Sequence, residues 1–173
     1  MKIEEFFNQR NIVDLSFFNF RNAITAAYFA NEGLEVQKVN DNFQSFFPVL
    51  GNVTNVYFPH VLEQLGGSGS QIEEFVKNIS EKGSVLIPEV HITIEGRQRV
   101  FSLLSTRTND DAFSYLNGVQ GQFVDRTAEW ELKKEREQLL EQKLLDREII
   151  EEKSRQLEDL ATKLAKYLSP QIY

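Results

Sequence analysis

Residues 113–132 read FSYLNGVQGQFVDRTAEWEL, and the character of the sequence changes inside this stretch. The part up to Val124 predicts a strand. After Asp125, Arg126 and Thr127 the chain turns to Glu, Lys, Arg, Gln and Leu, which are all good helix formers. No Pro or Gly occurs from there to Leu168. We therefore expect a folded domain to end at residues 125–127 and a long helix to begin there.

The long helix is predicted to pair with a second helix. At ~1.5 Å per residue it would be about 60 Å long, more than one globular domain needs. Apolar residues fall on the a and d positions of a heptad repeat, the pattern of a coiled coil. The seam that they form consists of Leu132, Leu139, Ile150, Leu157, Leu160, Leu164 and Tyr167. We expect a homodimer held by a parallel coiled coil.

The middle of this seam is polar. The same register places four charged residues at a and d positions, namely Arg136, Lys143, Asp146 and Lys153. Apolar residues lie beside the seam instead, at Leu140, Leu144, Leu145 and Ile149. Polar seam residues lower stability while fixing register or partner number. The pattern predicts a deformable centre, and a helix that is simply solvated is the alternative interpretation.

Upstream of residue 113, two strands are predicted to form a hairpin. Residues 85–95 alternate with period two, which places Val90, Ile92 and Ile94 on one face and His91 on the other. Residues 95–97, Glu-Gly-Arg, form the predicted turn, and residues 98–108 form the returning strand. Together with the strand at 113–124 this predicts three consecutive antiparallel strands.

The first half of the chain is predicted to supply two more strands and a helical crossing. Strands are expected at 23–30 and 34–39, joined by Asn-Glu-Gly at 31–33, where Gly33 would supply a positive φ. Asn40 is an expected N-cap for a short helix that stops at Pro48. Two further helices are expected at 56–64 and 70–80, with a flexible loop at 66–69 between them and Gly83 closing the second. Before residue 23 lies a leader with a short helix at 3–8 and an aromatic cluster at 17–20.

Two strands, a helical crossing and three antiparallel strands indicate an α+β domain. This order resembles a PAS domain over roughly Ala23 to Thr127. The resemblance is carried by residues 31–33, Val39-Asn40, Gly118-Val119-Gln120-Gly121 and the Asp125-x-Thr127 exit. It implies a PAS fold with a five-stranded antiparallel sheet of order 2-1-5-4-3, helices on one face and a cavity between them. It also implies dimerisation through the leader and the outgoing helix, and a tie between strand and helix at the exit.

The expected organisation follows from this resemblance. Residues 1–22 form a helical leader and dimerisation cap, 23–127 a PAS sensor domain, and 128–168 a signalling helix. Residues 169–173 begin a linker. Asp125, Arg126 and Thr127 would carry a signal from the sheet into the helix.

Composition excludes several classes of function. The net charge of −7 argues against a nucleic-acid partner, because phosphate binding needs a basic face. The chain has no Cys, which excludes disulfides and thiolate chemistry. No apolar stretch approaches the ~18 residues of a membrane span, and the first residues are not a signal peptide, so we expect a cytoplasmic protein. No catalytic triad, P-loop or metal-ligand pattern is present. We expect this region not to be an enzyme itself.

Five aromatic residues are candidates for the wall of an internal cavity: Phe43, Phe46, Phe47, Phe58 and Phe75. They could equally be a filled core, since buried aromatic side chains supply stability without a ligand. Flavin photoadduct chemistry is excluded by the absence of Cys, whereas flavin bound without an adduct is not. Haem-binding PAS domains use a His from a helix lining the cavity, and His60 is the candidate here. A lone His beside Pro is more often a surface residue, so we expect no cofactor.

The last ten residues, Leu164 to Tyr173, read LAKYLSPQIY. Pro170 must stop the helix and biases Ser169 away from helical conformation, so a hinge is expected. The segment resembles the one that leads into the catalytic domain of class III nucleotide cyclases. That resemblance implies a regulatory module joined to an adenylate or guanylate cyclase, with adenylate favoured. A module of a diguanylate cyclase or histidine kinase, or a stand-alone dimerisation scaffold, is the alternative.

Overall fold

The computed structural model of this protein describes residues 17–112 and 114–168. The chain separates into two compact units, residues 1–127 and residues 128–173. The predicted leader helix at 3–8 and the predicted linker at 169–173 lie outside the described residues. Within the leader, residues 17–22 are helical, and both Phe17 and Phe18 are exposed.

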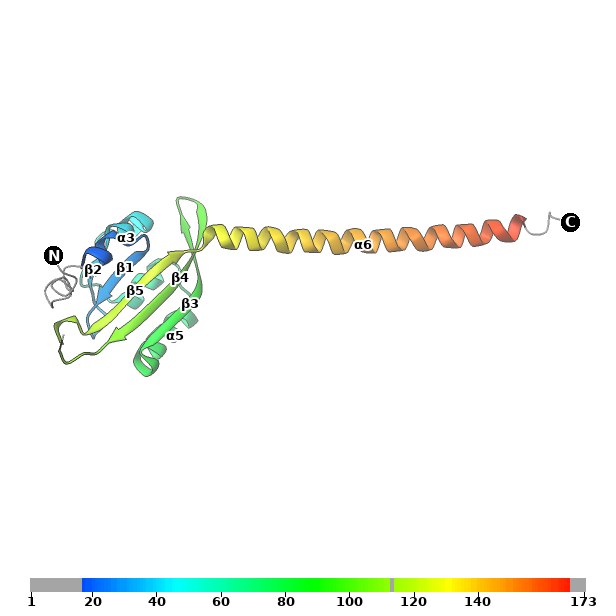
Figure 1. Ribbon diagram of the computed structural model, residues 1–173. Coiled ribbons are helices and arrows are strands. Elements are labelled where there is room, and N and C mark those ends of the chain that lie inside the picture. Colours follow the sequence, from blue (N-terminus) through cyan, green and yellow to red (C-terminus); the bar gives the residue numbers. More distant parts are fainter. Residues whose placement is uncertain (1–16, 113, 169–173) are drawn as a thin grey trace, which may run out of the picture. The chain divides into compact units, whose positions relative to one another are not determined.

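The first unit is built on one five-stranded antiparallel sheet. Its strands are β1 (Ala26–Ala30), β2 (Val36–Val39), β3 (Ser84–Ile94), β4 (Arg97–Thr108) and β5 (Gly118–Asp125). They lie in the order β2-β1-β5-β4-β3, which confirms the predicted topology. Figure 1 shows the first and last strands of the chain side by side in the sheet. This arrangement places β5, which leads into the C-terminal helix, at the centre.

The helical crossing between β2 and β3 contains three α-helices and a short 3-10 helix. The elements are α3 (Asp41–Phe46), η1 (Pro48–Leu50), α4 (Phe58–Gln64) and α5 (Gly69–Lys82). Asn40 caps α3 by accepting a hydrogen bond from the Phe43 amide, as expected. Gly83, in the left-handed conformation, ends α5. The predicted flexible loop at 66–69 contains the N-cap of α5, because Ser68 and Gln71 form a reciprocal capping box there.

The core lies between this crossing and one face of the sheet. Phe43, Phe58 and Phe75 from the helices and Phe101 and Phe123 from the strands are at most 1% exposed. On β3 and β4 the neighbouring residues Leu86 and Leu104 face the other way and are exposed by 58% and 42%. The predicted alternation around His91 is confirmed, since Val90 and Ile92 are buried and His91 is exposed. One face of the sheet therefore carries the helices and the core.

Several predicted boundaries are corrected. β1 begins at Ala26 and not at residue 23, because the carbonyls of Ala23 and Thr25 accept hydrogen bonds from Asn42 and Asn40 and are not in a strand ladder. β5 begins at Gly118 and follows a 3-10 turn, η2 (Ser114–Leu116), where we predicted strand from residue 113. β3 also contains a bulge between Ile87 and Val90, next to Pro88. An edge strand can accommodate a proline at such a point.

The first turn is also built differently from the prediction. Gly33 does not have a positive φ; Leu34 does, at 65°. Asn31 explains this, because its side-chain carbonyl accepts from the Glu35 amide and its backbone carbonyl accepts from the Leu34 amide. Leu34 is only 6% exposed, so burial offsets the ~1–2 kcal/mol cost of the left-handed conformation. The predicted turn at 95–97 is confirmed, with positive φ at both Glu95 and Gly96.

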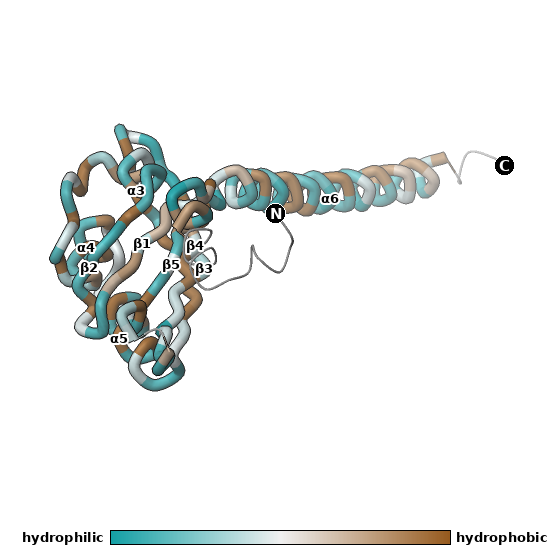
Figure 2. The backbone as a smooth tube through the Cα atoms, turned by 60° about the vertical axis from the view of Figure 1, so that its left-hand side comes forward, coloured by the Kyte–Doolittle hydropathy of each residue, from teal (hydrophilic) through white to brown (hydrophobic). Residues whose placement is uncertain are grey.

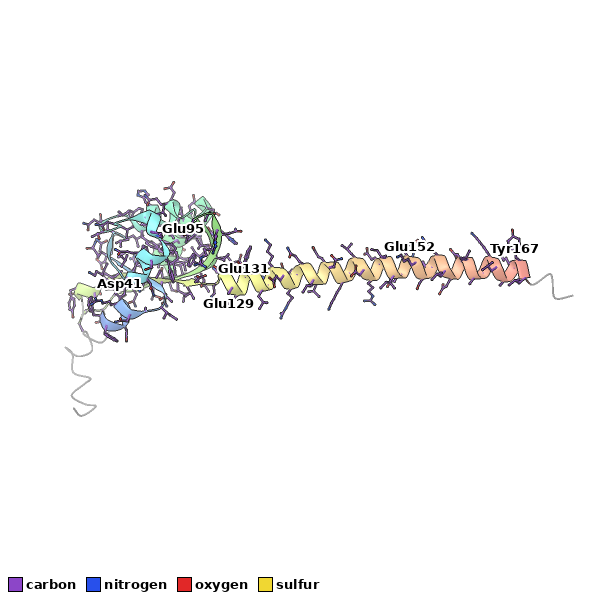
Figure 3. All side chains as sticks on the ribbon, turned by 90° about the horizontal axis from the view of Figure 1, so that it is seen from above. Asp41, Glu95, Glu129, Glu131, Glu152 and Tyr167 are labelled. Atoms are coloured by element: carbon purple, nitrogen blue, oxygen red, sulfur yellow. The ribbon has the colours of Figure 1, made fainter. Side chains whose placement is uncertain are left out.

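The C-terminal helix, α6, runs from Thr127 to Leu168 and contains 42 residues. Side chains project from it on all sides, including Glu152 and Tyr167 (Figure 3). Apolar bands recur along its length (Figure 2). Among the described residues no helix combines the length and the apolar character needed to cross a bilayer.

Candidate functional site

The exit from the sheet is a compact set of hydrogen bonds around the side chains of Asp125 and Thr127. Asp125 is the last residue of β5, and Thr127 is the first residue of α6. One carboxylate oxygen of Asp125 accepts from the Thr127 amide at 2.9 Å and from the Thr127 hydroxyl at 2.6 Å. The Asp125 side chain therefore satisfies an amide that has no partner within the helix.

The same site is joined to β4 at Val100. The Val100 amide donates to the Thr127 hydroxyl oxygen at 3.0 Å, and the Arg126 amide donates to the Val100 carbonyl at 2.8 Å. Thr127 is 7% exposed and Val100 is 1% exposed, so water competes little for these bonds. The helix start is consequently tied to the strand beside β5 as well as to β5 itself. A shift of β4 along its axis would displace Thr127 with it.

Arg126 and Arg99 extend this site at its edge. The Arg126 Nε donates to the Ser102 hydroxyl at 3.5 Å, and an Arg99 guanidinium nitrogen lies 3.8 Å from the second Asp125 carboxylate oxygen. Both distances are long. Because the Arg99 side chain is 48% exposed, its ion pair contributes little stability. The shorter hydrogen bonds of the exit include those that join Thr127 to Asp125 and to Val100.

The five predicted cavity residues come together in the core. Phe43, Phe47, Phe58 and Phe75 are at most 1% exposed, and Phe46 is partly buried against them. Their rings contact one another and the sheet: Phe43 meets Phe47 at 5.2 Å between centroids, and Phe58 meets Phe75 at 5.1 Å. Edge-to-face and tilted contacts at these separations are stabilising in themselves.

His60 lies apart from that cluster. It sits on α4 with its ring edge-to-face against Tyr57, 5.3 Å between centroids. It lines an open surface groove of about 560 Å³ between α4 and α5. His91 is on the outer face of β3 beside Glu89 and Gln98. Among residues 17–112 and 114–168 no group of three or more His, Asp or Glu side chains is placed to hold a metal ion.

A polar pair in the core was not anticipated from the sequence. The hydroxyls of Tyr28 on β1 and Ser105 on β4 are 2.5 Å apart, and both residues are buried. Gly121 on β5 pairs with both of them, so the three residues form one row across the central strands. The Tyr28 ring also stacks on Phe58 of α4, 3.9 Å between centroids. Burial raises the pKa of Tyr28 well above its usual range, and the hydrogen bond to Ser105 offsets part of that shift.

Asn40 does more than cap α3. Its side-chain carbonyl also accepts from the Ala27 amide at 2.9 Å, and its side-chain amide donates to the carbonyls of Thr25 at 2.8 Å and Phe20 at 3.1 Å. One buried amide thus joins the leader, β1 and α3. In the sequence, the location of Asn40 directly after a predicted strand indicates only that it caps α3. The sequence does not indicate its bonds to the leader and β1.

All seven predicted seam residues lie on α6 and are exposed by more than half: Leu132, Leu139, Ile150, Leu157, Leu160, Leu164 and Tyr167. The four apolar residues beside the seam are equally exposed, at 53–60%. Arg147 and Glu151, one helical turn apart on α6, form an ion pair at 3.6 Å. Such pairs stabilise a helix by only ~0.3–0.5 kcal/mol.

Comparison with solved structures identifies the fold. The PAS domain of Bordetella pertussis BvgS is 17% identical, with a TM-score of 0.50, covering 76% of this chain and 98% of that domain. An RNA-binding Light-Oxygen-Voltage receptor is 15% identical, with a TM-score of 0.60, covering 78% of this chain and 39% of the receptor. No family model matches the sequence, and no curated protein matches it.

The first unit of the chain therefore has the PAS fold, and a long helix follows it. At these identities the likeness extends to the fold alone. It confirms the architecture that the sequence predicted for residues 23–127.

Proposed function

We propose that this chain is a sensor and dimerisation module, in which a PAS domain passes a signal through a parallel pair of α6 helices to a class III nucleotide cyclase domain. The observation that carries the proposal is the combination of the clamped exit at residues 125–127 with a long helix whose apolar seam is more than half exposed in the described part of the chain. The clamp supports transmission, and the seam supports pairing with a second copy.

The seam argues for pairing because water is a poor environment for it. Burying one Leu or Ile side chain contributes about 1.5–3 kcal/mol. From Ile150 to Tyr167 each a and d position except Lys153 is apolar. A second copy in parallel orientation would bring identical apolar residues together in successive layers.

The clamp argues for transmission because it fixes the helix start to two strands of the sheet. Any event that shifts β4 relative to β5 would change how Thr127 is held. The polar seam positions between Arg136 and Lys153 give two paired helices no strong preference for one register. Such an element, with states a few kcal/mol apart, is what a switch requires.

The cyclase assignment rests on the resemblance of residues 164–173 to the segment that leads into those catalytic domains. α6 ends at Leu168. Residues 169–173, with Pro170, lie outside the described part of the chain. A cyclase whose active sites form between two subunits would respond to a change in the relative position of two helix ends.

Sedimentation equilibrium tests the dimer. The wild-type chain should have twice its 20.0 kDa mass at micromolar concentration. The double variant Leu157→Asp/Leu164→Asp should dissociate, because it places charges in the apolar seam. Thr162→Asp/Ala165→Asp adds the same two charges outside the seam and should leave the dimer intact. A wild-type monomer at high concentration would refute the pairing.

A regulation assay tests the switch. The module is placed before a class III cyclase catalytic domain, and Arg136→Ile, Lys143→Ile, Asp146→Leu and Lys153→Leu are combined. These replacements complete the apolar seam, so cyclase activity should become fixed at one level. Retention of the full regulatory range would refute the proposed role of the polar centre. A module that regulates only a histidine kinase or a diguanylate cyclase would refute the cyclase assignment and leave the dimer standing.

A further inference from the structure

The centre of α6 carries apolar side chains that a two-stranded seam does not use. Leu140, Leu144, Leu145 and Ile149 are exposed by 55%, 60%, 55% and 53%. They form two pairs spaced four residues apart, Leu140 with Leu144 and Leu145 with Ile149. Residues four apart lie on the same side of a helix, one turn above the other. Each pair is therefore a short apolar stripe.

The two stripes lie on opposite flanks of the seam. In the register that places Ile150 at an a position, Leu140 takes position e and Leu144 takes position b. Leu145 takes position c and Ile149 takes position g. Positions e and b follow one flank, and positions g and c follow the other. A helix with apolar residues on both flanks of its a/d seam has a wider apolar face than a two-stranded coiled coil buries.

A parallel dimer would bring the stripes of two copies together, and this step rests on the proposed function. The two-fold axis places the e flank of one helix beside the g flank of its partner. Each face of the dimer would then present one Leu140–Leu144 stripe and one Leu145–Ile149 stripe. At ~1.5 Å per residue, this patch is about 15 Å long, the length of a three-turn helix. The dimer would carry two identical patches, one on each face.

The charges around the patch decide what can cover it. Residues 135–152 contain seven acidic and three basic residues, a formal net charge of −4. A second α6 pair laid on the patch would bring two such acidic segments together, which is unfavourable. The anionic surface of a membrane would be repelled for the same reason. A helix with basic residues flanking an apolar face is complementary in both respects.

We propose that the patch formed by residues 140–149 is a docking surface for a basic amphipathic helix of a partner protein, one helix on each face of the α6 dimer. The contact is a helix-in-groove interaction in which Leu and Ile side chains supply affinity and the surrounding carboxylates select basic partners. The complex contains two partner helices and two copies of this chain.

Fluorescence anisotropy with the full chain tests the proposal. The probe is a labelled 14-residue amphipathic peptide of Leu and Lys, and a peptide with Glu in place of each Lys is the charge control. The patch variant is Leu140→Gln/Leu144→Gln/Leu145→Gln/Ile149→Gln, which keeps every charge. Leu86→Gln/Leu104→Gln, on the exposed sheet face, is the matched control. The Lys peptide should bind one per chain, and the patch variant should weaken binding about tenfold or more.

Each other result has a definite meaning. Equal binding of the Lys peptide to wild type and patch variant overturns the proposal, and so does equal binding of the Glu peptide. Tetramers that the patch variant abolishes would assign the patch to a second dimer and also overturn it. Sedimentation of each variant separates these outcomes from failure of the proposed dimer. If wild type is a monomer, both proposals fail; if it is a dimer with no selective binding, only this one does.

Discussion

Replacing Gly121 with Ala should destabilise the PAS domain strongly. Gly121 lies between Tyr28 and Ser105 in the central row of the sheet. A Cβ atom there would lie 2.6 Å from a ring carbon of Tyr28 and 2.7 Å from the Leu104 carbonyl oxygen, and it would overlap the Ser105 hydroxyl oxygen. Ordinary contacts of a Cβ atom begin near 3.4 Å. At least one of these three neighbours must move.

None of them can move cheaply. The Tyr28 ring is 0% exposed and stacked on Phe58, and the Leu104 carbonyl belongs to the backbone of a central strand. Overpacking of this kind costs about 1–3 kcal/mol. Separating the two hydroxyls leaves a buried polar group unsatisfied, for about 1–3 kcal/mol more. Replacing Gly by Ala also lowers the conformational entropy of the unfolded chain, which offsets about 0.4–1 kcal/mol of this loss. We expect a net loss of about 2–4 kcal/mol.

Urea unfolding measures this loss. Near-ultraviolet circular dichroism reports the packed aromatic residues of the domain, whereas far-ultraviolet signal is dominated by helix. With a slope of about 1–3 kcal/mol per molar urea, the midpoint should fall by about 1–2 M. Gly69→Ala is the matched control, because a Cβ atom there meets nothing within 4 Å. If Gly121→Ala is as stable as Gly69→Ala, the reasoning is wrong. Adding Ser105→Ala to Gly121→Ala should recover part of the lost stability, because it removes the hydroxyl oxygen that the new Cβ atom at position 121 would overlap.

Three further predictions concern the other buried polar groups. Asn40→Ala leaves several backbone groups without partners and should lower the free energy of unfolding, measured with urea, by about 2–4 kcal/mol. A loss below about 1 kcal/mol would contradict the role of the Asn40 side chain in joining the leader, β1 and α3. Thr127→Val keeps the shape but removes the hydroxyl, so exchange of the Val100 amide hydrogen should become about tenfold faster or more, while unchanged exchange would show that the exit clamp is not formed. Because burial raises the pKa of Tyr28, stability should fall as pH rises above the ordinary tyrosine pKa of about 10, and Tyr28→Phe should fall less steeply; identical pH profiles would refute this.

The sequence determined those features that depend on residues close together in the chain. Period-two alternation located β3 and its outer residue His91, and Asn40 and Gly83 marked a helix start and a helix end. The uninterrupted run of helix formers located α6. The same local reasoning gave a wrong prediction for the turn at 31–33, where Gly33 was expected to have a positive φ. Leu34 has it instead, because the Asn31 side chain closes the turn and the core buries the leucine.

Only the tertiary structure decided which distant residues meet. The Tyr28–Ser105 hydrogen bond exists because β5 lies between β1 and β4, and because Gly121 has no side chain to separate the two hydroxyls. The clamp on Thr127 depends in the same way on β4 lying beside β5, so that Val100 reaches the start of α6. Neither pair shares a local pattern, since 77 and 27 residues separate the partners. Hydrogen bonds across strands are fixed by sheet order and register, and these follow from packing of the whole domain.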